Sequence, residues 1–135
     1  MAYRSLLIDT SIIIEFLRKK NKRSSVLWDV MEDGLNCVIS TITIFELYAG
    51  AKTKKHITDL EKILKWLFVV PFSREIAEQS AEIYKELRRN NQLIDFRDIF
   101  IGATSIVLDI PIVTHNKRHF ERIQGITIYG GRREQ

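Results

Sequence analysis

The apolar residues of the chain follow two alternating patterns, short unbroken runs and longer stretches with helical spacing. Unbroken runs are typical of strands that are buried on both faces of a parallel sheet. They predict strands over residues 3–9, 36–40, 68–72, 110–115 and 125–130. Helical spacing predicts helices over residues 10–20, 24–34, 41–53, 56–68, 73–90, 95–109 and 116–123. Strands that alternate with helices predict parallel strands joined by right-handed crossovers. We therefore expect an α/β fold, a three-layer α/β/α sandwich with a four- or five-stranded parallel sheet.

Local signals suggest where some of these helices begin and end. Ser73 is expected to cap the helix over 73–90, and Ser40 or Thr41 to open the helix over 41–53. Gly34 is expected to stop the helix that precedes it. No Pro/Gly-rich linker divides the chain, so we predict a single domain over residues 1–130, with 131–135 as a frayed tail.

Composition narrows the functional classes. The chain has 135 residues, a net charge of +4 and a sequence pI near 9.3, which suits a polyanion partner such as nucleic acid. No apolar stretch approaches the ~20 residues that span a bilayer, so no membrane segment is expected. The single cysteine, Cys37, cannot form an internal disulfide, and a cytoplasmic location is therefore expected.

Candidate chemistry begins with Asp9, an acid inside the apolar run LLIDTSIII. A carboxylate there is costly to bury unless something compensates its charge. Asp9 lies where the first predicted strand ends, and ligands of open parallel sheets bind beyond the carboxyl ends of the strands. We therefore expect Asp9 to face a functional cleft.

Other polar residues occupy equivalent places along the chain. Glu46 follows the second predicted strand, and Asn116 follows the predicted strand over 110–115. Asp95 and Asp98 lie at the start of the mostly apolar helix over 95–109. Clustered carboxylates repel one another unless a cation lies between them. Oxygen ligands suit Mg²⁺ or Mn²⁺ and not Zn²⁺. Such an ion activates a water for attack on phosphorus.

Each of these residues also has an ordinary structural explanation. Asp9 and Asp95 are suited to cap the helices that follow them, and Asn116 is suited to a turn. Glu46 can pair with a lysine or reach solvent, and Asp98 can pair with an arginine such as Arg88. Taken together, at successive strand ends of one sheet, the functional interpretation is favoured.

The ordered motifs resemble those of the PIN-domain ribonucleases, in particular the VapC-type toxins of toxin–antitoxin pairs. The matching segments are LLIDTSIIIEFL, ISTITIFELYAGA and DFRDIFIGATSIVLDIPIVTHNKRHFERIQGI, which span almost the whole chain. The resemblance implies a Mg²⁺- or Mn²⁺-dependent endoribonuclease whose core acids match Asp9, Glu46 and Asp98. The fourth acidic position of the family falls on Asn116, a neutral amide, which favours one firmly bound ion over two.

The resemblance also implies supporting residues and partners. Ser11 and Thr114 match positions that hydrogen-bond the acids or the metal-bound water, and Asp95 is expected to help as an outer metal ligand. A VapB-type antitoxin would block the site with a C-terminal segment, and the protein would form a homodimer. Basic residues that flank the predicted cleft are expected to bind RNA: Arg18, Lys19, Lys20, Lys117 and Arg118.

Three other functions remain to be weighed. A non-catalytic PIN-like module that binds RNA or a protein is the main alternative, and Asn116 is the residue that favours it. A phosphohydrolase with an aspartyl nucleophile is disfavoured, because such enzymes need a second aspartate two residues after the first one. Here the first is Asp9, and the residue two positions later is Ser11. A response-regulator receiver is disfavoured too, because Asp9 has no adjacent acid. His119 is expected to pack beside the last short helix, and no protein general base is assigned.

Overall fold

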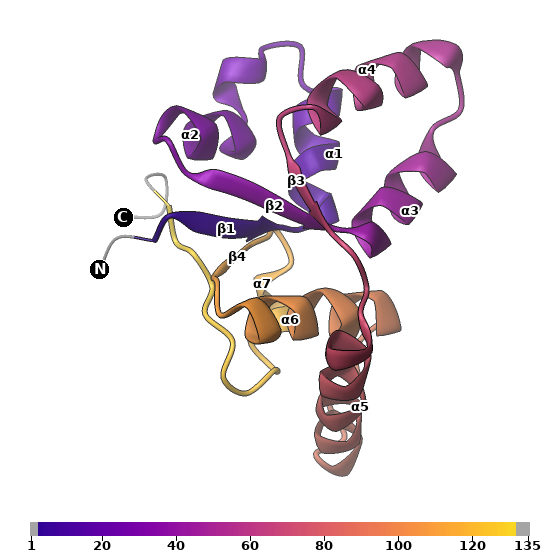
Figure 1. Ribbon diagram of the computed structural model, residues 1–135, viewed down its shortest axis with the longest axis vertical. Coiled ribbons are helices and arrows are strands. Elements are labelled where there is room, and N and C mark those ends of the chain that lie inside the picture. Colours follow the sequence, from indigo (N-terminus) through magenta and orange to yellow (C-terminus); the bar gives the residue numbers. More distant parts are fainter. Residues whose placement is uncertain (1–2, 132–135) are drawn as a thin grey trace.

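A four-stranded, all-parallel sheet lies at the centre of the computed structural model, which describes residues 3–131 (Figure 1). The strands are β1 (Ser5–Ile8), β2 (Asn36–Ser40), β3 (Phe68–Val70) and β4 (Ile112–Val113). Their order across the sheet is β3-β2-β1-β4, and each neighbouring pair is parallel. Helices cover both faces, so the predicted α/β/α sandwich with a parallel sheet is confirmed.

Seven α-helices and one short 3-10 helix connect and cover the strands in the described part of the chain. They are α1 (Thr10–Arg18), η1 (Lys22–Ser24), α2 (Val26–Glu32), α3 (Thr41–Gly50), α4 (Lys54–Leu64), α5 (Arg74–Arg89), α6 (Phe96–Leu108) and α7 (Lys117–Phe120). The Ser40 and Ser73 side chains accept hydrogen bonds from backbone amides of α3 and α5, which confirms both predicted caps. Gly34 has a φ of +77°, and α2 ends just before it, as expected.

Two separate hydrophobic clusters fill the space between the sheet and its helices. On one face, Leu6 and Ile8 of β1 pack with apolar residues of α1, α2 and α4. On the other face, Leu7 packs with apolar residues of α5, α6 and α7. Successive side chains of a strand point to opposite faces, and here both faces are covered. Because both faces are buried, the sequence of β1 is an unbroken apolar run.

The predicted strand over residues 125–130 is wrong. That segment forms a single isolated bridge with β4, between Ile112 and Ile128. The Ile112 amide donates to the Thr127 carbonyl, and the Tyr129 amide donates to the Ile112 carbonyl, both at 2.9 Å. β4 has just two residues, so it offers too short an edge for a further ladder. The sheet therefore has four strands.

Some predicted boundaries also shift. The expected helix over 24–34 is preceded by the turn η1 and starts at Val26. The expected helix over 41–53 ends at Gly50, and Thr53 instead caps α4. The single domain over 1–130 stays a prediction, and residues 132–135 of the predicted tail lie outside the described residues.

No helix in the described part of the chain is long and apolar enough to cross a membrane. The carboxyl ends of the strands lead into α1 and α3 almost without a loop, since Thr10 and Thr41 open these helices. Side chains in the first turns of both helices are therefore held beside the same edge of the sheet.

Candidate active site

Three carboxylates gather at this edge of the sheet, those of Asp9, Glu46 and Asp98, and we call them the acidic cluster. Asp9 directly follows β1, Glu46 lies in the second turn of α3, and Asp98 lies in the first turn of α6. Burial raises the pKa of Glu46, and the nearby charges of Asp9 and Asp98 raise it further. Burial also raises the pKa of Asp98, and Asp9 adds to this shift. The three acids therefore share one electrostatic environment.

Asp9 is the most deeply buried member, with 2% of its surface exposed. It occupies the N-cap position of α1, but its side chain makes no capping hydrogen bond. Its Oδ2 instead accepts hydrogen bonds from Ser11 Oγ at 2.8 Å and Thr114 Oγ1 at 2.6 Å. Helix capping therefore does not explain this buried acid, and two hydroxyl groups fix its orientation.

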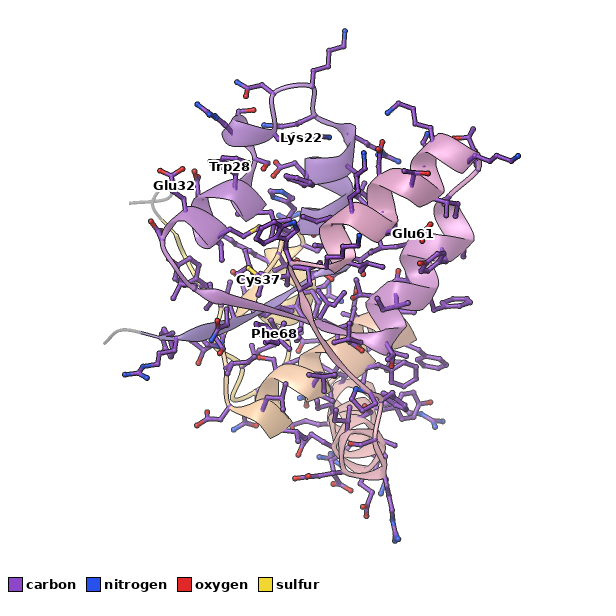
Figure 2. The ribbon with its side chains drawn as sticks, turned by 45° about the horizontal axis from the view of Figure 1, so that its top comes forward. Lys22, Trp28, Glu32, Cys37, Glu61 and Phe68 are labelled. Carbon is purple, nitrogen blue, oxygen red and sulfur yellow. The ribbon has the colours of Figure 1, made fainter. Side chains whose placement is uncertain are left out.

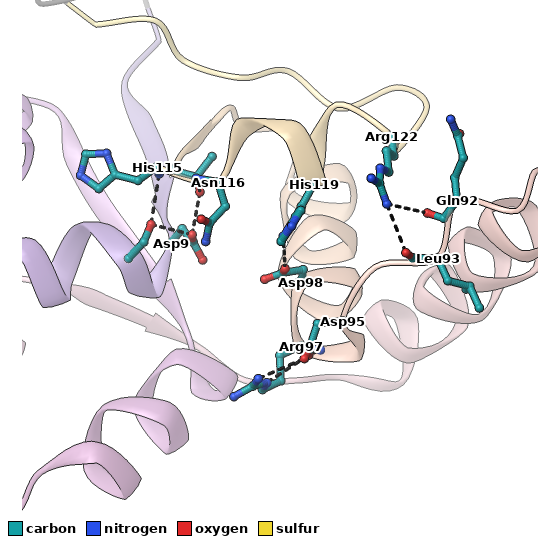
Figure 3. A network of polar contacts seen from close by, with 12 residues as sticks. Asp9, Gln92, Leu93, Asp95, Arg97, Asp98, His115, Asn116, His119 and Arg122 are labelled. Atoms are coloured by element: carbon teal, nitrogen blue, oxygen red, sulfur yellow. Dashed lines mark hydrogen bonds and ion pairs between the residues drawn. The ribbon is translucent and has the colours of Figure 1, made fainter.

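The loop after β4 is tied to this same edge (Figure 3). The backbone amide of Asn116 donates to Thr114 Oγ1 at 2.9 Å, and that of His115 donates to Ser11 Oγ at 3.1 Å. Asn116 is the N-cap residue of α7, but its side chain makes no capping hydrogen bond. The hydroxyls that orient Asp9 thus also position Asn116 beside the acidic cluster.

Glu46 is held by a different set of side chains. Thr10 Oγ1 lies 2.9 Å from Glu46 Oε1 and 3.0 Å from Thr43 Oγ1. An ionised carboxylate can only accept, so the Thr10 hydroxyl donates to Glu46 and the Thr43 hydroxyl donates to Thr10. Both threonines are buried. Neither threonine was predicted from sequence to support the acids, although Thr10 was a candidate cap of the first helix.

Arg97 connects Glu46 to Asp95. Its Nη1 lies 3.4 Å from Glu46 Oε2, while its Nε and Nη2 each donate to Asp95 at 3.0 Å. The backbone amide of Arg97 also donates to Asp95 Oδ1, so Asp95 caps α6. These hydrogen bonds from Arg97 lower the pKa of Asp95. Asp95 is therefore engaged by Arg97, outside the acidic cluster.

Asp98 pairs with His119, whose Nδ1 lies 3.0 Å from Asp98 Oδ2 (Figure 3). From sequence, Arg88 is a candidate partner for Asp98, and His119 is expected to pack beside the last short helix. The structure corrects both expectations, since His119 belongs to α7 and turns its ring toward α6. The two partners lie 21 positions apart in the sequence, and no local signal indicated this contact.

The five predicted RNA-binding residues lie in two places. Lys117 and Arg118 open α7 and line a hollow together with Thr114 and Asn116. The other three lie at the end of α1, where they line a larger hollow: Arg18, Lys19 and Lys20. The hollow at α7 thus adjoins the residues around Asp9, whereas the hollow at the end of α1 is lined by no member of the acidic cluster.

The donor set of the acidic cluster fits a hard divalent cation. Its ligands are carboxylate oxygens, and the raised pKa values of Glu46 and Asp98 show that added positive charge would favour the ionised cluster. Among the described residues, no three carboxylate, imidazole or thiol groups converge as a finished ligand set. Glu46 pairs with Arg97 in this structure, and Asp98 pairs with His119.

Comparisons with known proteins agree with this arrangement. The PIN domain family matches residues 6–126. Ribonuclease VapC1 of Methanocaldococcus jannaschii is 34% identical over 127 residues, which cover 92% of this chain and 86% of the relative. Ribonuclease VapC19 of Mycobacterium tuberculosis is 30% identical over 114 residues, which cover 84% of this chain and 90% of the relative.

Solved structures show the same fold. A DNA-bound VapBC complex from Salmonella typhimurium contains a chain with a TM-score of 0.84 and 27% identity, covering 94% of this chain and 98% of that one. VapBC2 from Rickettsia felis, bound to a promoter DNA fragment, gives a TM-score of 0.81 at 22% identity, covering 93% and 97%. By sequence and by fold, the chain belongs to the PIN-domain family, and its relatives there are VapC proteins.

Proposed function

We propose that this protein is a Mg²⁺-dependent endoribonuclease, with Mn²⁺ as a possible substitute, and that it acts in the cytoplasm as the toxin of a VapBC-type pair. The acidic cluster is the observation that carries the proposal, because it places three carboxylates at the strand ends of a PIN-domain fold. The ribonuclease names of the relatives support RNA as the substrate.

Asp9, Glu46 and Asp98 are the residues that would hold the ion. When bound, the ion lowers the pKa of a water and neutralises charge on the phosphate. The chain's own contribution is to fix these oxygens in advance. Ser11 and Thr114 hold the Asp9 carboxylate, and Thr10 holds that of Glu46. Such supporting hydrogen bonds commonly tune ligands by ~10–100-fold in metal affinity or activity.

Asn116 and Asp95 take lesser parts in this proposal. The Asn116 amide adds no charge, so the cluster carries three formal negative charges and suits one firmly bound ion. Asp95 is tied to Arg97 by two side-chain hydrogen bonds and would influence the ion from outside the ligand set.

RNA cleavage tests the proposal. Purified protein would be incubated with a pool of structured RNAs in Mg²⁺, in Mn²⁺ and in chelator, beside Asp98→Asn and the exposed-acid control Glu82→Gln. We expect wild type and Glu82→Gln to cleave RNA with either ion and not in chelator. We expect Asp98→Asn to cleave RNA in none of these conditions. Cleavage that persists in chelator or in Asp98→Asn would contradict the proposal.

A non-catalytic binding module is the second candidate. Asn116 favours it, because the amide removes one charge from the site. Arg97 and His119 favour it too, since both already partner the acids. Metal-dependent cleavage that is lost in Asp98→Asn would exclude this candidate. RNA binding without cleavage in any ion would support it.

A VapB-type antitoxin and a second copy of this chain are the proposed protein partners. VapBC complexes among the related structures support the antitoxin. Exposed apolar side chains on α3, on the edge strand β3 and around the start of α6 support a homodimer: Phe45, Phe68, Val69, Leu93 and Phe96. Light scattering should report a dimer that Phe68→Lys converts to monomer, and a wild-type monomer would contradict this.

A further inference from the structure

A hollow between the end of α1 and α4 concentrates positive charge, and we call it the basic groove. Six cationic side chains line it: Arg18, Lys19, Lys20, Lys22, Lys55 and Lys62. Among the described residues that line it, Asp59 is the one carboxylate. The whole chain, in contrast, has 21 Lys and Arg against 17 Asp and Glu. The groove therefore carries a positive charge far out of proportion to its size.

The α4 side of the groove is a single helical stripe. Lys55, Asp59, Lys62 and Trp66 follow one another at spacings of four, three and four residues, which place them on one face. The Trp66 amide donates to the Ile63 carbonyl at 2.9 Å, so the chain is still turning there. Figure 2 shows Lys22 at the opposite side, near the end of α1.

Much of this charge has no protein partner. Asp59 is already paired with Lys55 at 2.9 Å. The side chains of Arg18 and Lys20 make no hydrogen bond or ion pair with any described residue. The Lys19 and Lys22 ammonium groups donate to backbone carbonyls, which leave their positive charge in place. Like charges held this close repel one another and destabilise the fold unless an anion binds between them. The groove is therefore electrostatically complementary to a polyanion.

Trp66 adds an aromatic surface to the groove. Its side chain is 69% exposed, although a large indole is usually buried. Phe16 lines the groove as well, with Lys22 Nζ 5.1 Å from the centre of its ring. A positive groove with an exposed aromatic ring, here that of Trp66, is the combination that binds unpaired nucleic-acid strands, through phosphate contacts and base stacking.

The groove also leads toward the acidic cluster. An adjoining hollow is also lined by Glu46, and it shares four lining residues with the basic groove: Leu17, Arg18, Lys55 and Asp59. We propose that the basic groove binds the single-stranded flank of an RNA substrate, with Trp66 stacking on a base, and directs the strand to the acidic cluster. This inference deepens the proposed function and rests on it for the identity of the polyanion. It adds Lys22, Lys55, Lys62 and Trp66 to the basic residues predicted from sequence.

Fluorescence anisotropy with a labelled single-stranded RNA tests the groove without cleavage. All proteins would carry Asp98→Asn and be kept in chelator. Lys20→Glu and Lys62→Glu, each made alone, should weaken binding about tenfold at ~0.1 M salt and lower the salt slope by roughly 0.7 per lost phosphate contact. Lys85→Glu, an exposed lysine of α5 that pairs with Glu82, is the matched charge control and should change neither value.

Tryptophan fluorescence tests the stacking directly. The chain has two tryptophans, so Trp28→Phe leaves Trp66 as the sole reporter, and Trp66→Phe leaves Trp28. Added RNA should quench the emission of Trp66 and leave that of Trp28 unchanged. Trp66→Ala should bind RNA about tenfold more weakly.

Three outcomes would overturn the inference. The first is equal RNA binding by the groove variants and Lys85→Glu, and the second is unchanged Trp66 emission. The third is that the groove substitutions weaken the binding of a poly-glutamate peptide but leave RNA binding unchanged. That result would assign the groove to an acidic protein segment. Because no assay here needs cleavage, failure of the nuclease proposal would show separately, in the metal-dependent assay with wild-type protein.

Discussion

The two sides of the acidic cluster compensate their charge by different means. Asp9 is almost wholly buried and is held by two neutral hydroxyls, those of Ser11 and Thr114. Glu46 and Asp98 are only partly buried and face Arg97 and His119. Hydroxyls fix the direction of a carboxylate and leave its charge in place, whereas a cation cancels that charge.

The difference suggests a division of roles. Asp9 is preorganised, because its two partners come from separate parts of the chain, Ser11 from α1 and the buried Thr114 from directly after β4. Glu46 and Asp98 are exchangeable, because a divalent ion can replace the contacts that Arg97 and His119 make with them. On this view the Asp9 carboxylate is in place before the ion binds. Glu46 keeps its hydrogen bond from Thr10 but exchanges its contact with Arg97, and Asp98 exchanges its contact with His119, when the ion and RNA arrive.

The largest effect is expected from Asp9→Asn. The amide can still accept hydrogen bonds from Ser11 and Thr114, so the fold should persist with a melting temperature near that of wild type. The loss of the preorganised charge should lower the RNA cleavage rate by about 10³-fold, since a bound ion supplies several kcal/mol. Single-turnover cleavage measures this, and a rate within tenfold of wild type would contradict a central role for Asp9.

Thr114→Val should have the next largest effect. It removes the hydroxyl that donates to Asp9 and accepts from Asn116, with little change in shape. Mn²⁺ affinity should fall about 10–100-fold, as is usual for lost supporting hydrogen bonds. Thr114→Ser should restore it, and His119→Gln should cost less. The control is Thr104→Val, another buried threonine, whose hydroxyl donates within α6.

Glu46 and Asp98 should make the free energy of unfolding depend on pH. The pKa values of Glu46 and Asp98 are raised above the ordinary 4.5 and 3.8, chiefly by burial. The folded chain therefore keeps protons that the unfolded chain has released. These two acids should lower the free energy of unfolding as the pH rises through a window that opens near those ordinary values.

Urea denaturation in chelator measures this contribution. Stability relative to wild type should rise with pH for Asp98→Asn and for Glu46→Gln, since each variant lacks one titrating group. Arg97→Gln should deepen the fall, because it removes a cation that lowers the pKa of Glu46. The difference in free energy of unfolding between wild type and each acid variant should therefore change with pH. If it stays constant for both variants, the raised pKa values of Glu46 and Asp98 are contradicted.

The smallest effect is expected from Asp95→Ala. The substitution removes the cap of α6 and should lower the free energy of unfolding by about 1 kcal/mol. Asp95→Ser keeps a capping oxygen and should recover most of it. Cleavage should stay close to wild type in both, because Asp95 is engaged by Arg97 outside the acidic cluster. A loss as large as that of Asp9→Asn would instead make Asp95 a direct metal ligand.

Much of the fold could be predicted from local patterns. The unbroken apolar runs of β1 and β2 indicated strands covered on both faces, and the separate clusters on the two faces confirm it. The error at residues 125–130 has a clear cause. That segment has strand composition, but strand formation needs a neighbouring edge, and β4 provides one bridge. The length of a partner strand cannot be read from the segment itself.

At the candidate site too, local sequence patterns do not reveal contacts between distant segments. Asp9, Glu46 and Asp98 could be singled out because each follows a recognisable element boundary. Their partners could not, since Arg97 is 51 residues from Glu46 and Thr114 is 105 from Asp9. Such contacts depend on the relative placement of elements. The one local hint was Arg97 itself, a cation placed between two acids in the stretch DFRD.

Mn²⁺ binding measured by electron paramagnetic resonance tests the central claim most directly. Chelator-treated wild type would be titrated beside Asp9→Asn, Glu46→Gln and the exposed-acid control Glu82→Gln. We predict that wild type and Glu82→Gln bind the ion, and that each cluster variant binds it at least tenfold more weakly. Equal Mn²⁺ binding by all four proteins would contradict the claim that the acidic cluster is a metal site.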